Sequence, residues 1–334
     1  MVKSCPYLLA VVVGVVVGCL GKALPPSPVP QSAPASLLVS GVASSTLDLA
    51  AVVASAPDGA VIEIPDGEYR IAPIRVEGRS LTLRALPGAR PRLRVFADSR
   101  RWDALLASDG DLTLVGLDLA GDETGLAPLV LVEGGKLRLV DCKFTQRGSS
   151  PAVSVRRGAG VEILRSELWA LAQGVAVELG AEPCPVCLDQ ARLEIRDAIG
   201  PALLLWCPEI EPGARAEVTL RDCDIRAGRV VACRCVGGGV RLEAERNKLS
   251  FRQALVSFDG CGGRDDWRRL LHYEGRENRH EAAGAWLRLE GQPANVWSEQ
   301  AWAKHWPERR AGTSVGGEIP SAPRDSSLQS GVSR

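Results

Sequence analysis

Four carboxylates in this sequence have the type and placement to support acid–base chemistry. Glu162 and Glu194 each stand between two aliphatic residues, and Asp265 and Asp266 are adjacent. A pair of carboxylates can act as general acid and base in glycosidic bond cleavage, and acidic side chains also bind calcium. The competing interpretation for Glu162 is a solvated charged face, where it pairs with Arg138. For Asp265 and Asp266 it is the exposed rim of a capping element.

Six of the ten cysteines form a second set of reactive side chains. They are Cys184, Cys187, Cys207, Cys233, Cys235 and Cys261. In the repeat described below they fall at one corner of neighbouring coils about 4.8 Å apart, which predicts structural disulfides of unassigned pairing. Two alternatives remain: a zinc site of four thiolates at Cys184, Cys187, Cys233 and Cys235, or redox chemistry at the Cys-x-x-Cys pair.

An internal repeat indicates the elements that position these side chains. An apolar-x-apolar triplet followed by a polar turn begins at Leu81, Leu112, Leu137, Val161, Leu193, Val218 and Val240. The successive intervals are 31, 25, 24, 32, 25 and 22 residues. A second short apolar strand precedes most of the triplets, and glycines separate the two strands. Two short strands per unit predict coils that stack on one another as a parallel β-helix.

The repeat also predicts which side chains point inward and which point outward. Small or apolar residues recur five positions after the start of a triplet, as expected for a buried stack: Leu117, Cys142, Ser166, Ala198 and Cys223. The middle residues of the triplets predict an outward column: Thr113, Arg138, Glu162, Glu194, Thr219 and Arg241. The alternative folds are a leucine-rich horseshoe, which would show an Asn at a fixed place in each unit, and an antiparallel sandwich, which would show closer turn signals. The sequence shows neither pattern.

The N-terminus has the pattern of an export signal, with Lys3, an apolar run over 6–20 and Lys22. Residues 16–19 resemble a lipoprotein lipobox, which predicts lipidation of Cys19. An uncleaved membrane anchor and simple secretion are the alternatives. All three place the rest of the chain outside the cytoplasm, in the periplasm, at the cell surface or secreted.

The expected organisation has five parts. They are a leader or anchor at 1–22, a proline-rich linker at 23–44, a parallel β-helix at 45–262, a C-terminal cap at 263–310 and a disordered tail at 311–334. A short helix is expected over 45–56, closed by a Pro-Asp-Gly turn. Trp267, Trp286, Trp297, Trp302 and Trp306 gather at the other end and are expected to cover the last coil.

Two segments carry a resemblance to known proteins. The helix and strands over 47–93 resemble the opening of right-handed β-helix proteins of the pectate-lyase-like superfamily. The segment HYEGREN at 272–278, with Trp286, Trp302 and Trp306, resembles the end of extracytoplasmic β-helix regions in planctomycete-type membrane serine/threonine kinases. The resemblance covers about 46–310 and implies an all-β, right-handed parallel β-helix solenoid with a short N-terminal capping helix and a Trp-rich C-terminal cap. The kinase motifs are missing from the sequence, so it is not a kinase.

The balance of charged residues argues against nucleic acid as a partner. The 40 Lys and Arg residues balance 40 Asp and Glu residues, so no positive surplus favours nucleic acid. We therefore expect a non-catalytic module that needs no cofactor, binds cell-envelope glycan or protein, or acts as a scaffold, and attaches to the membrane through its N-terminus. The alternative is a polysaccharide lyase or glycoside hydrolase of the β-helix type, for which a calcium requirement would favour the lyase. A purely structural envelope component is the third possibility.

Overall fold

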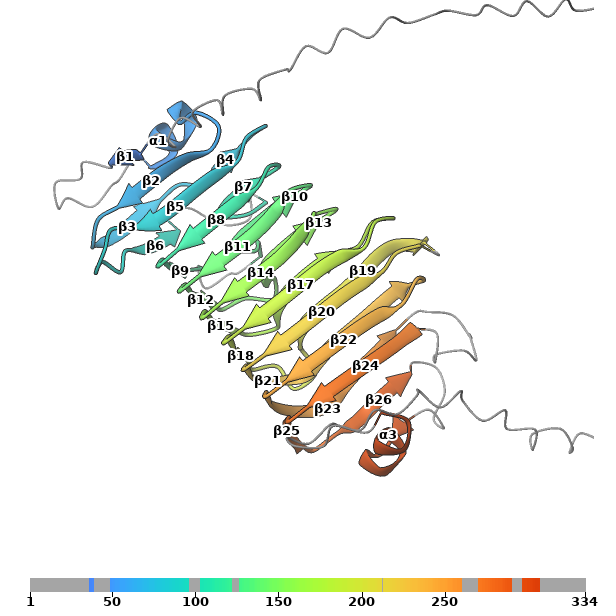
Figure 1. The fold of residues 1–334 in the computed structure, drawn as a ribbon. Coiled ribbons are helices and arrows are strands. Elements are labelled where there is room, and N and C mark those ends of the chain that lie inside the picture. Colours follow the sequence, from blue (N-terminus) through green and yellow to red (C-terminus); the bar gives the residue numbers. More distant parts are fainter. Residues whose placement is uncertain are drawn as a thin grey trace, which may run out of the picture. The chain divides into compact units, whose positions relative to one another are not determined.

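The computed structural model describes residues 36–38, 49–95, 103–121, 126–211, 213–259, 270–289 and 296–306, all within one compact unit, Pro34–Arg334. In these residues short parallel strands stack coil upon coil, with the helices α1 (Leu49–Ser55) and α3 (Glu299–His305) near the two ends (Figure 1). The all-β parallel β-helix predicted from the repeat is confirmed.

The strands form three parallel ladders, which we call A, B and C. Ladder A is the ten-stranded sheet of the described residues, in the order β1 (Ser36–Leu38), β2 (Ala60–Ile64), β5 (Leu81–Ala85), β8 (Leu112–Val115), β11 (Lys136–Val140), β14 (Gly160–Leu164), β17 (Cys184–Asp189), β20 (Ala216–Arg221), β22 (Val240–Glu245) and β24 (Leu271–Arg276). Each strand pairs with the corresponding strand of the next coil, so the register repeats along the stack.

Ladders B and C together make the second sheet. Ladder B contains β3 (Glu68–Ile71), β6 (Arg92–Val95), β9 (Asp118–Ala120), β12 (Lys143–Gln146), β15 (Glu167–Ala170), β18 (Arg192–Ile195), the first halves of β21 (Asp224–Val236) and β23 (Lys248–Asp259), and β25 (Arg279–Ala282). Ladder C contains β4 (Ile74–Val76), β7 (Leu106–Ser108), β10 (Val130–Glu133), β13 (Pro151–Arg156), β16 (Gln173–Glu178), β19 (Pro201–Glu211), the second halves of β21 and β23, and β26 (Ala285–Leu289). The antiparallel strand β27 (Val296–Trp297) follows β26.

The prediction of two strands per coil was therefore wrong by one. The predicted triplets lie on ladder A, apart from that at Leu193, and the predicted second strands lie on ladder C. Ladder B strands such as β12 and β15 are four residues long and show only two buried side chains each, a signal too short to separate from a turn.

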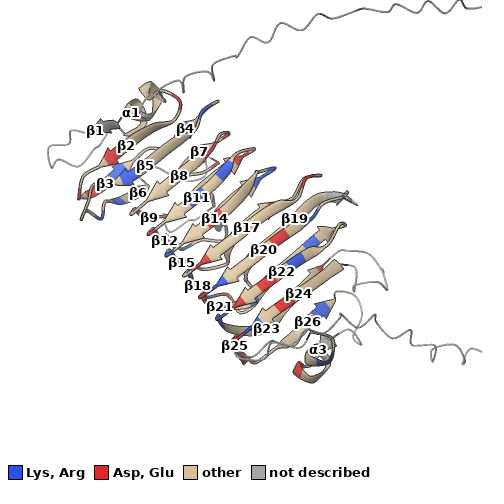
Figure 2. Ribbon diagram, in the orientation of Figure 1, with Lys and Arg blue, Asp and Glu red and all other residues tan. Residues whose placement is uncertain are grey.

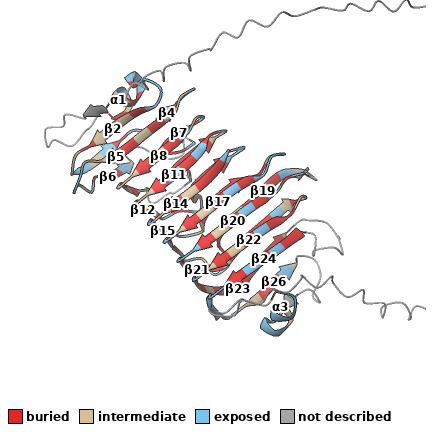
Figure 3. Cartoon of the chain, in the orientation of Figure 1, coloured by how far each residue is buried: buried red, intermediate tan, exposed pale blue. Residues whose placement is uncertain are grey.

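Alternation within each strand builds the core. In β5, Leu81 and Leu83 are buried, whereas Thr82 and Arg84 point outward. The same two-residue period runs through the other strands of ladder A, where buried and exposed positions alternate (Figure 3). Because side chains in a strand point to opposite faces in turn, each coil contributes aliphatic residues to the interior, and these are covered by the next coil.

The corner between ladders A and B has one backbone conformation in successive coils. A residue with positive φ occupies it each time: Gly116, Asp141, Arg165, Gln190, Asp222, Arg246 and Glu277. This conformation costs a residue with a Cβ roughly 1–2 kcal/mol. Offsetting hydrogen bonds come from the N–H groups at this corner, which donate to the next coil, as from Asp141 to Leu164 at 3.1 Å and from Asp222 to Glu245 at 3.0 Å.

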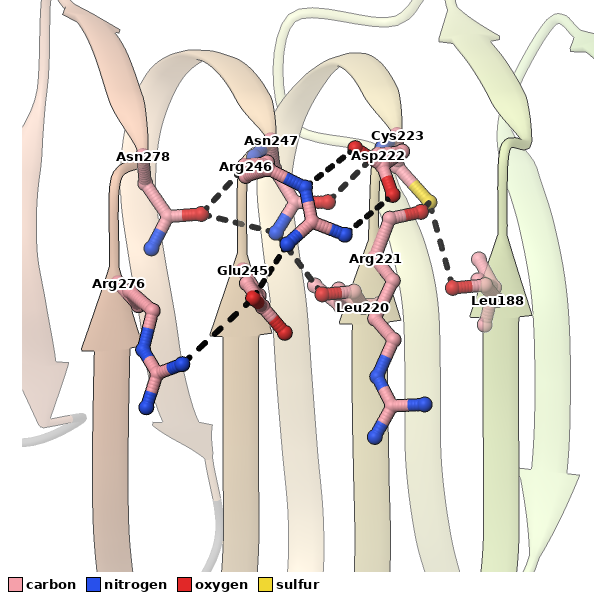
Figure 4. A network of polar contacts seen from close by, with 10 residues as sticks. All are labelled: Leu188, Leu220, Arg221, Asp222, Cys223, Glu245, Arg246, Asn247, Arg276 and Asn278. Carbon is pink, nitrogen blue, oxygen red and sulfur yellow. Dashed lines mark hydrogen bonds and ion pairs between the residues drawn. The ribbon is translucent and has the colours of Figure 1, made fainter. Parts of the chain in front are cut away.

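The residue after this corner points inward and forms a buried stack. Leu117, Cys142, Ser166 and Cys223 lie in it as predicted, each no more than 2% exposed. The prediction for Ala198 was wrong: Ala198 is exposed, and the buried residue of that coil is Ala191. The stack continues through Asn247 and Asn278, which hydrogen bond along it (Figure 4).

Both ends of the stack have the expected caps. Leu49 and Val53 of α1 are fully buried, and the Arg79 guanidinium donates to the Val53 carbonyl at 2.9 Å and to the Ala56 carbonyl at 2.5 Å. The first residues of the expected helix, 45–48, lie outside the described residues.

At the other end, Trp302 of α3 is 1% exposed. Its ring centroid lies 4.8 Å from that of Tyr273 on β24, 4.6 Å from Trp306 and 5.7 Å from Trp286 on β26. This aromatic cluster covers the last coil, so the Trp-rich cap is confirmed; Trp267 lies outside the described residues.

Candidate functional site

Glu162 lies on the outward face of ladder A, where it forms ion pairs. Its carboxylate is 3.3 Å from Arg138 Nε and 3.4 Å from Lys136 Nζ, both from β11. The pairing of Glu162 with Arg138 suggested by the sequence is confirmed. In the next coil the residue opposite Glu162 is Cys187 rather than a second carboxylate.

The candidate carboxylate pair of Glu162 and Glu194 is therefore not formed, because the two residues lie on different ladders. Glu194 lies on β18 in ladder B, opposite Trp169, and its carboxylate is 3.7 Å from Arg192. The triplet at Leu193 has the same apolar-x-apolar pattern as ladder A but belongs to another ladder. The interval of 32 residues before it does not reveal this shift, because the interval of 31 residues from Leu81 to Leu112 stays on ladder A.

The outward column of ladder A differs from the expected order at Arg241. Arg241 was expected to follow Thr219 in the outward column, but it lies opposite Glu217, and Glu243 is opposite Thr219. The other candidate acids, Asp265 and Asp266, lie outside the described residues.

The cysteines do not share one corner, so that prediction was wrong. Cys184 and Cys187 lie on β17 in ladder A, while Cys207 on β19 and Cys233 and Cys235 on β21 belong to ladder C. No disulfide joins any two cysteines in the described part of the chain. The error has the same origin as that for Glu194, because the coil containing Leu193 was assigned to the wrong ladder. Cys19 and Cys261 lie outside the described residues.

Burial sets the protonation of several thiols. It raises the pKa of Cys142, Cys184 and Cys223 to about 11. The pKa of Cys187 is also raised, first by burial and then by the negative charges of Asp189 and Glu162. Zinc binding and redox chemistry both use the thiolate, which these environments disfavour. Within the described ranges, no three or more His, Cys, Asp or Glu side chains gather in a group that could hold a metal ion.

A groove on ladder C brings together charged and aromatic side chains that were not predicted from the sequence. It has a volume of about 570 Å³ and is lined by Glu133, Gly134, Arg156, Arg157, Glu178 and Trp206. In-register pairing places one of these side chains on each of four coils: Glu133 on β10, Arg156 on β13, Glu178 on β16 and Trp206 on β19. In the sequence, each of these four residues comes directly after the apolar stretch of a predicted second strand, and this shared position is the signal that could have identified them.

Ion pairs hold the polar side chains of this groove in place. Glu133 Oε2 lies 3.0 Å from Arg75 and its Oε1 lies 3.5 Å from Arg156. Glu178, with 9% of its side chain exposed, lies 3.5 Å from the well-exposed Arg157. The side chain of Trp206 is half-buried at the end of this column.

This groove, hereafter the Trp206 groove, has the composition of a ligand-binding surface. Its volume falls within the roughly 300–1,000 Å³ of small-molecule sites. An indole ring offers a flat apolar face, and the neighbouring carboxylates and guanidinium groups accept and donate hydrogen bonds. Together these groups match a sugar, which has an apolar ring face and a rim of hydroxyl groups.

None of the helices in the described residues has the length and apolar character needed to cross a membrane. No protein-family model matches this sequence, and no curated protein matches it.

Proposed function

We propose that this β-helix is a non-catalytic binding or scaffolding module of the cell envelope, with a glycan or a protein as its ligand. The observation that carries the proposal is the Trp206 groove, in which Trp206, Glu178 and Arg156 occupy matching positions of neighbouring coils. Stacked coils about 4.8 Å apart present such side chains at a fixed repeat, which suits a ligand that is itself a chain of similar units.

The location of the module is part of the proposal. The leader pattern over 1–22, with Cys19 as the lipidation site, supports an extracytoplasmic protein tethered to the membrane or secreted. The resemblance to right-handed β-helices of the pectate-lyase-like superfamily, and to the outer region of planctomycete-type kinases, supports the same location. In this interpretation the chain corresponds to the outer β-helix region of those proteins.

One observation favours the alternative, a carbohydrate-active lyase or hydrolase. Glu133 and Glu178 flank Arg156 in the same column, one coil on either side. Two carboxylates on either side of a guanidinium are the functional groups that glycosidic bond cleavage uses. Because Glu133 is paired with Arg75 and Arg156, and Glu178 with Arg157, we assign these groups to ligand binding.

A glycan array with the full-length protein tests the proposal. We expect binding by the wild type, loss of binding in Trp206→Ala, and retention in Trp169→Ala, which removes another outward Trp from ladder B. Absence of both glycan binding and capture of an envelope protein would contradict the binding function. Polysaccharide turnover that is lost in Glu133→Gln or Glu178→Gln but kept in Glu162→Gln would establish the enzyme alternative instead.

A further inference from the structure

An aliphatic strip interrupts the charged residues on the outward face of ladder A. Val115, Val140 and Leu164 lie in register on β8, β11 and β14, and each is only half-buried. The other members of this outward column, from β2 to β24, are all charged: Glu63, Arg84, Asp189, Arg221, Glu245 and Arg276. Figure 2 shows the same change, with charged residues on β5 and β20 and none on β8. The three side chains therefore leave apolar surface in contact with water, which a partner can cover.

Ion pairs of opposite sense border this strip on its two sides. On the side of the middle column, Arg138 Nε lies 3.3 Å from Glu162, whose carboxylate is also 3.4 Å from Lys136 Nζ. On the side of the corner, Arg165 donates to Asp141 through Nε and Nη2, both at 2.9 Å. The coil of β11 thus has a cation on the first side and a carboxylate on the second, and the coil of β14 has the reverse. In the coil of β8 both positions are uncharged.

This order of charges is complementary to itself across a two-fold axis that runs along the strip. Such an axis places each coil against the same coil of a second copy and reverses the direction of its strands. Arg138 then lies on the side of the partner's Asp141, Glu162 on the side of the partner's Arg165, and Val140 meets the partner's Val140. The ion pairs within each chain stay intact, so the charges alternate in sign around the strip. A two-fold axis along the strands would instead set Arg138 against the partner's Arg138, which charge repulsion disfavours.

We propose that two copies of this chain pair face to face through this surface, hereafter the dimer strip. Val115, Val140 and Leu164 form its apolar centre, and the bordering ion pairs form its polar rim. Arg84 and Asp189 continue the column at the two ends, where each faces its own copy, so like charges limit the contact to three coils. An interface of this size is at the small end of specific interfaces, and we expect a dissociation constant in the micromolar range.

The dimer strip is separate from the Trp206 groove. The strip lies on ladder A and the groove on ladder C, and the two share no residue. A dimer carries two Trp206 grooves, which raises the avidity for a ligand made of repeated units. That consequence rests on the proposed function, whereas the pairing of the two copies does not, so each proposal can fail while the other stands.

Sedimentation equilibrium of the full-length protein over the micromolar range tests the pairing. We expect a reversible monomer–dimer equilibrium in the wild type. Val140→Asp sets two carboxylates against each other on the axis and should weaken the dimer at least about tenfold. The matched control is Thr219→Asp, which places the same charge on the outward face of ladder A outside the strip and should leave the dimer unchanged. Thermal melting of both variants establishes that they remain folded.

A mixing experiment tests the two-fold arrangement itself. Arg138→Glu faces the partner's Asp141 with a like charge, and Asp141→Arg does the same to the partner's Arg138, so each variant alone should be monomeric. An equimolar mixture should restore the dimer, because the new carboxylate of one variant meets the new guanidinium of the other. A wild type that stays monomeric, equal effects of Val140→Asp and Thr219→Asp, or a mixture that stays monomeric would each overturn the proposal.

Discussion

Asn278 Oδ1 accepts two hydrogen bonds from Asn247, one from its backbone N–H at 3.0 Å and one from its Nδ2 at 2.9 Å (Figure 4). Asn247 connects to the preceding coil in the same way. Its Oδ1 accepts from the Cys223 N–H at 2.9 Å, and its Nδ2 donates to the Leu220 carbonyl at 2.9 Å. One amide thus joins three coils at a buried corner, where a lone polar group would be costly.

Replacement of Asn247 by Ala should lower the free energy of unfolding by about 2–5 kcal/mol, because it leaves the buried Cys223 N–H without its acceptor and removes the side-chain bonds to Leu220 and Asn278. Ser166→Ala should lower the free energy of unfolding less, since the Ser166 hydroxyl makes only two hydrogen bonds. It accepts one from the Cys142 N–H and donates one to the Leu164 carbonyl. Urea unfolding measures both. The control is Ser250→Ala, whose exposed hydroxyl bonds to Glu281. Equal midpoints for Asn247→Ala and this control would refute the prediction.

The outer side of the same corner predicts a pH dependence. The hydrogen bonds from Arg246 and Arg165 lower the pKa of Asp222 and Asp141, respectively. A carboxylate whose folded pKa lies below its unfolded value stabilises the protein above the unfolded pKa. That contribution disappears as the pH falls through the lower, folded pKa, so stability should drop between about pH 4 and the acid limit.

Asp222→Asn isolates this effect. The variant should be less stable than the wild type at neutral pH, and the difference should shrink as the pH is lowered to about 3. Urea midpoints over this range measure it. Glu217→Gln is the control, since Glu217 is exposed and forms no ion pair within the described residues. A difference between Asp222→Asn and wild type that does not change with pH would show that Asp222 acts through packing alone.

The stack itself was predictable because its signal repeats. Seven triplets in one chain, each with an apolar residue on either side of a middle position, are hard to explain except by coils that bury each other. The same repeat predicted that Cys142 and Cys223, five positions after the start of a triplet, point inward at the corner. Asn247 and Asn278 escaped notice because the triplets were counted from Val240; counting from Leu242 and Tyr273 leads directly to both.

The candidate site was less predictable, because one misplaced strand moves its own residues, and the cysteines placed relative to it, to the wrong ladder. Leu193 and Val186 both begin apolar-x-apolar triplets, and only the pairing of Glu162 with Cys187 shows which one follows β14. The groove on ladder C was harder still. Trp206 stands out only when the residues of neighbouring coils are known, since it belongs to a column that runs across the coils.

The C-terminal cap should be one of the most sensitive parts of the fold. Trp302→Ala removes a fully buried ring that packs on Tyr273, Trp286 and Trp306, and should cost about 3–5 kcal/mol. It also uncovers the last coil, whose open edge can pair with another chain. Thermal melting and size-exclusion chromatography should show a less stable, association-prone protein. Trp302→Phe should be milder, because Trp302 Nε1 has no hydrogen-bond partner in the described residues. Trp169→Ala serves as the surface control.

Thiol labelling distinguishes the buried-thiol arrangement from the disulfides expected from the sequence. With the pKa of Cys142, Cys184 and Cys223 raised to about 11, these thiols should stay protonated and react very slowly with iodoacetamide at about pH 8. Cys187 and Cys235 are only partly buried, so they should be labelled before the buried thiols of the described residues.

Unfolding in urea without reductant should then expose Cys142, Cys184, Cys187 and Cys223 to labelling, which mass spectrometry reads peptide by peptide. A cysteine that remains unlabelled in urea but is labelled after reduction must have been oxidised. Such a result at Cys184 or Cys187 would mean that the protein forms a disulfide through movement of β17, because that strand holds Cys184 inside the core of ladder A. Full labelling of both would assign them to packing rather than to covalent cross-linking.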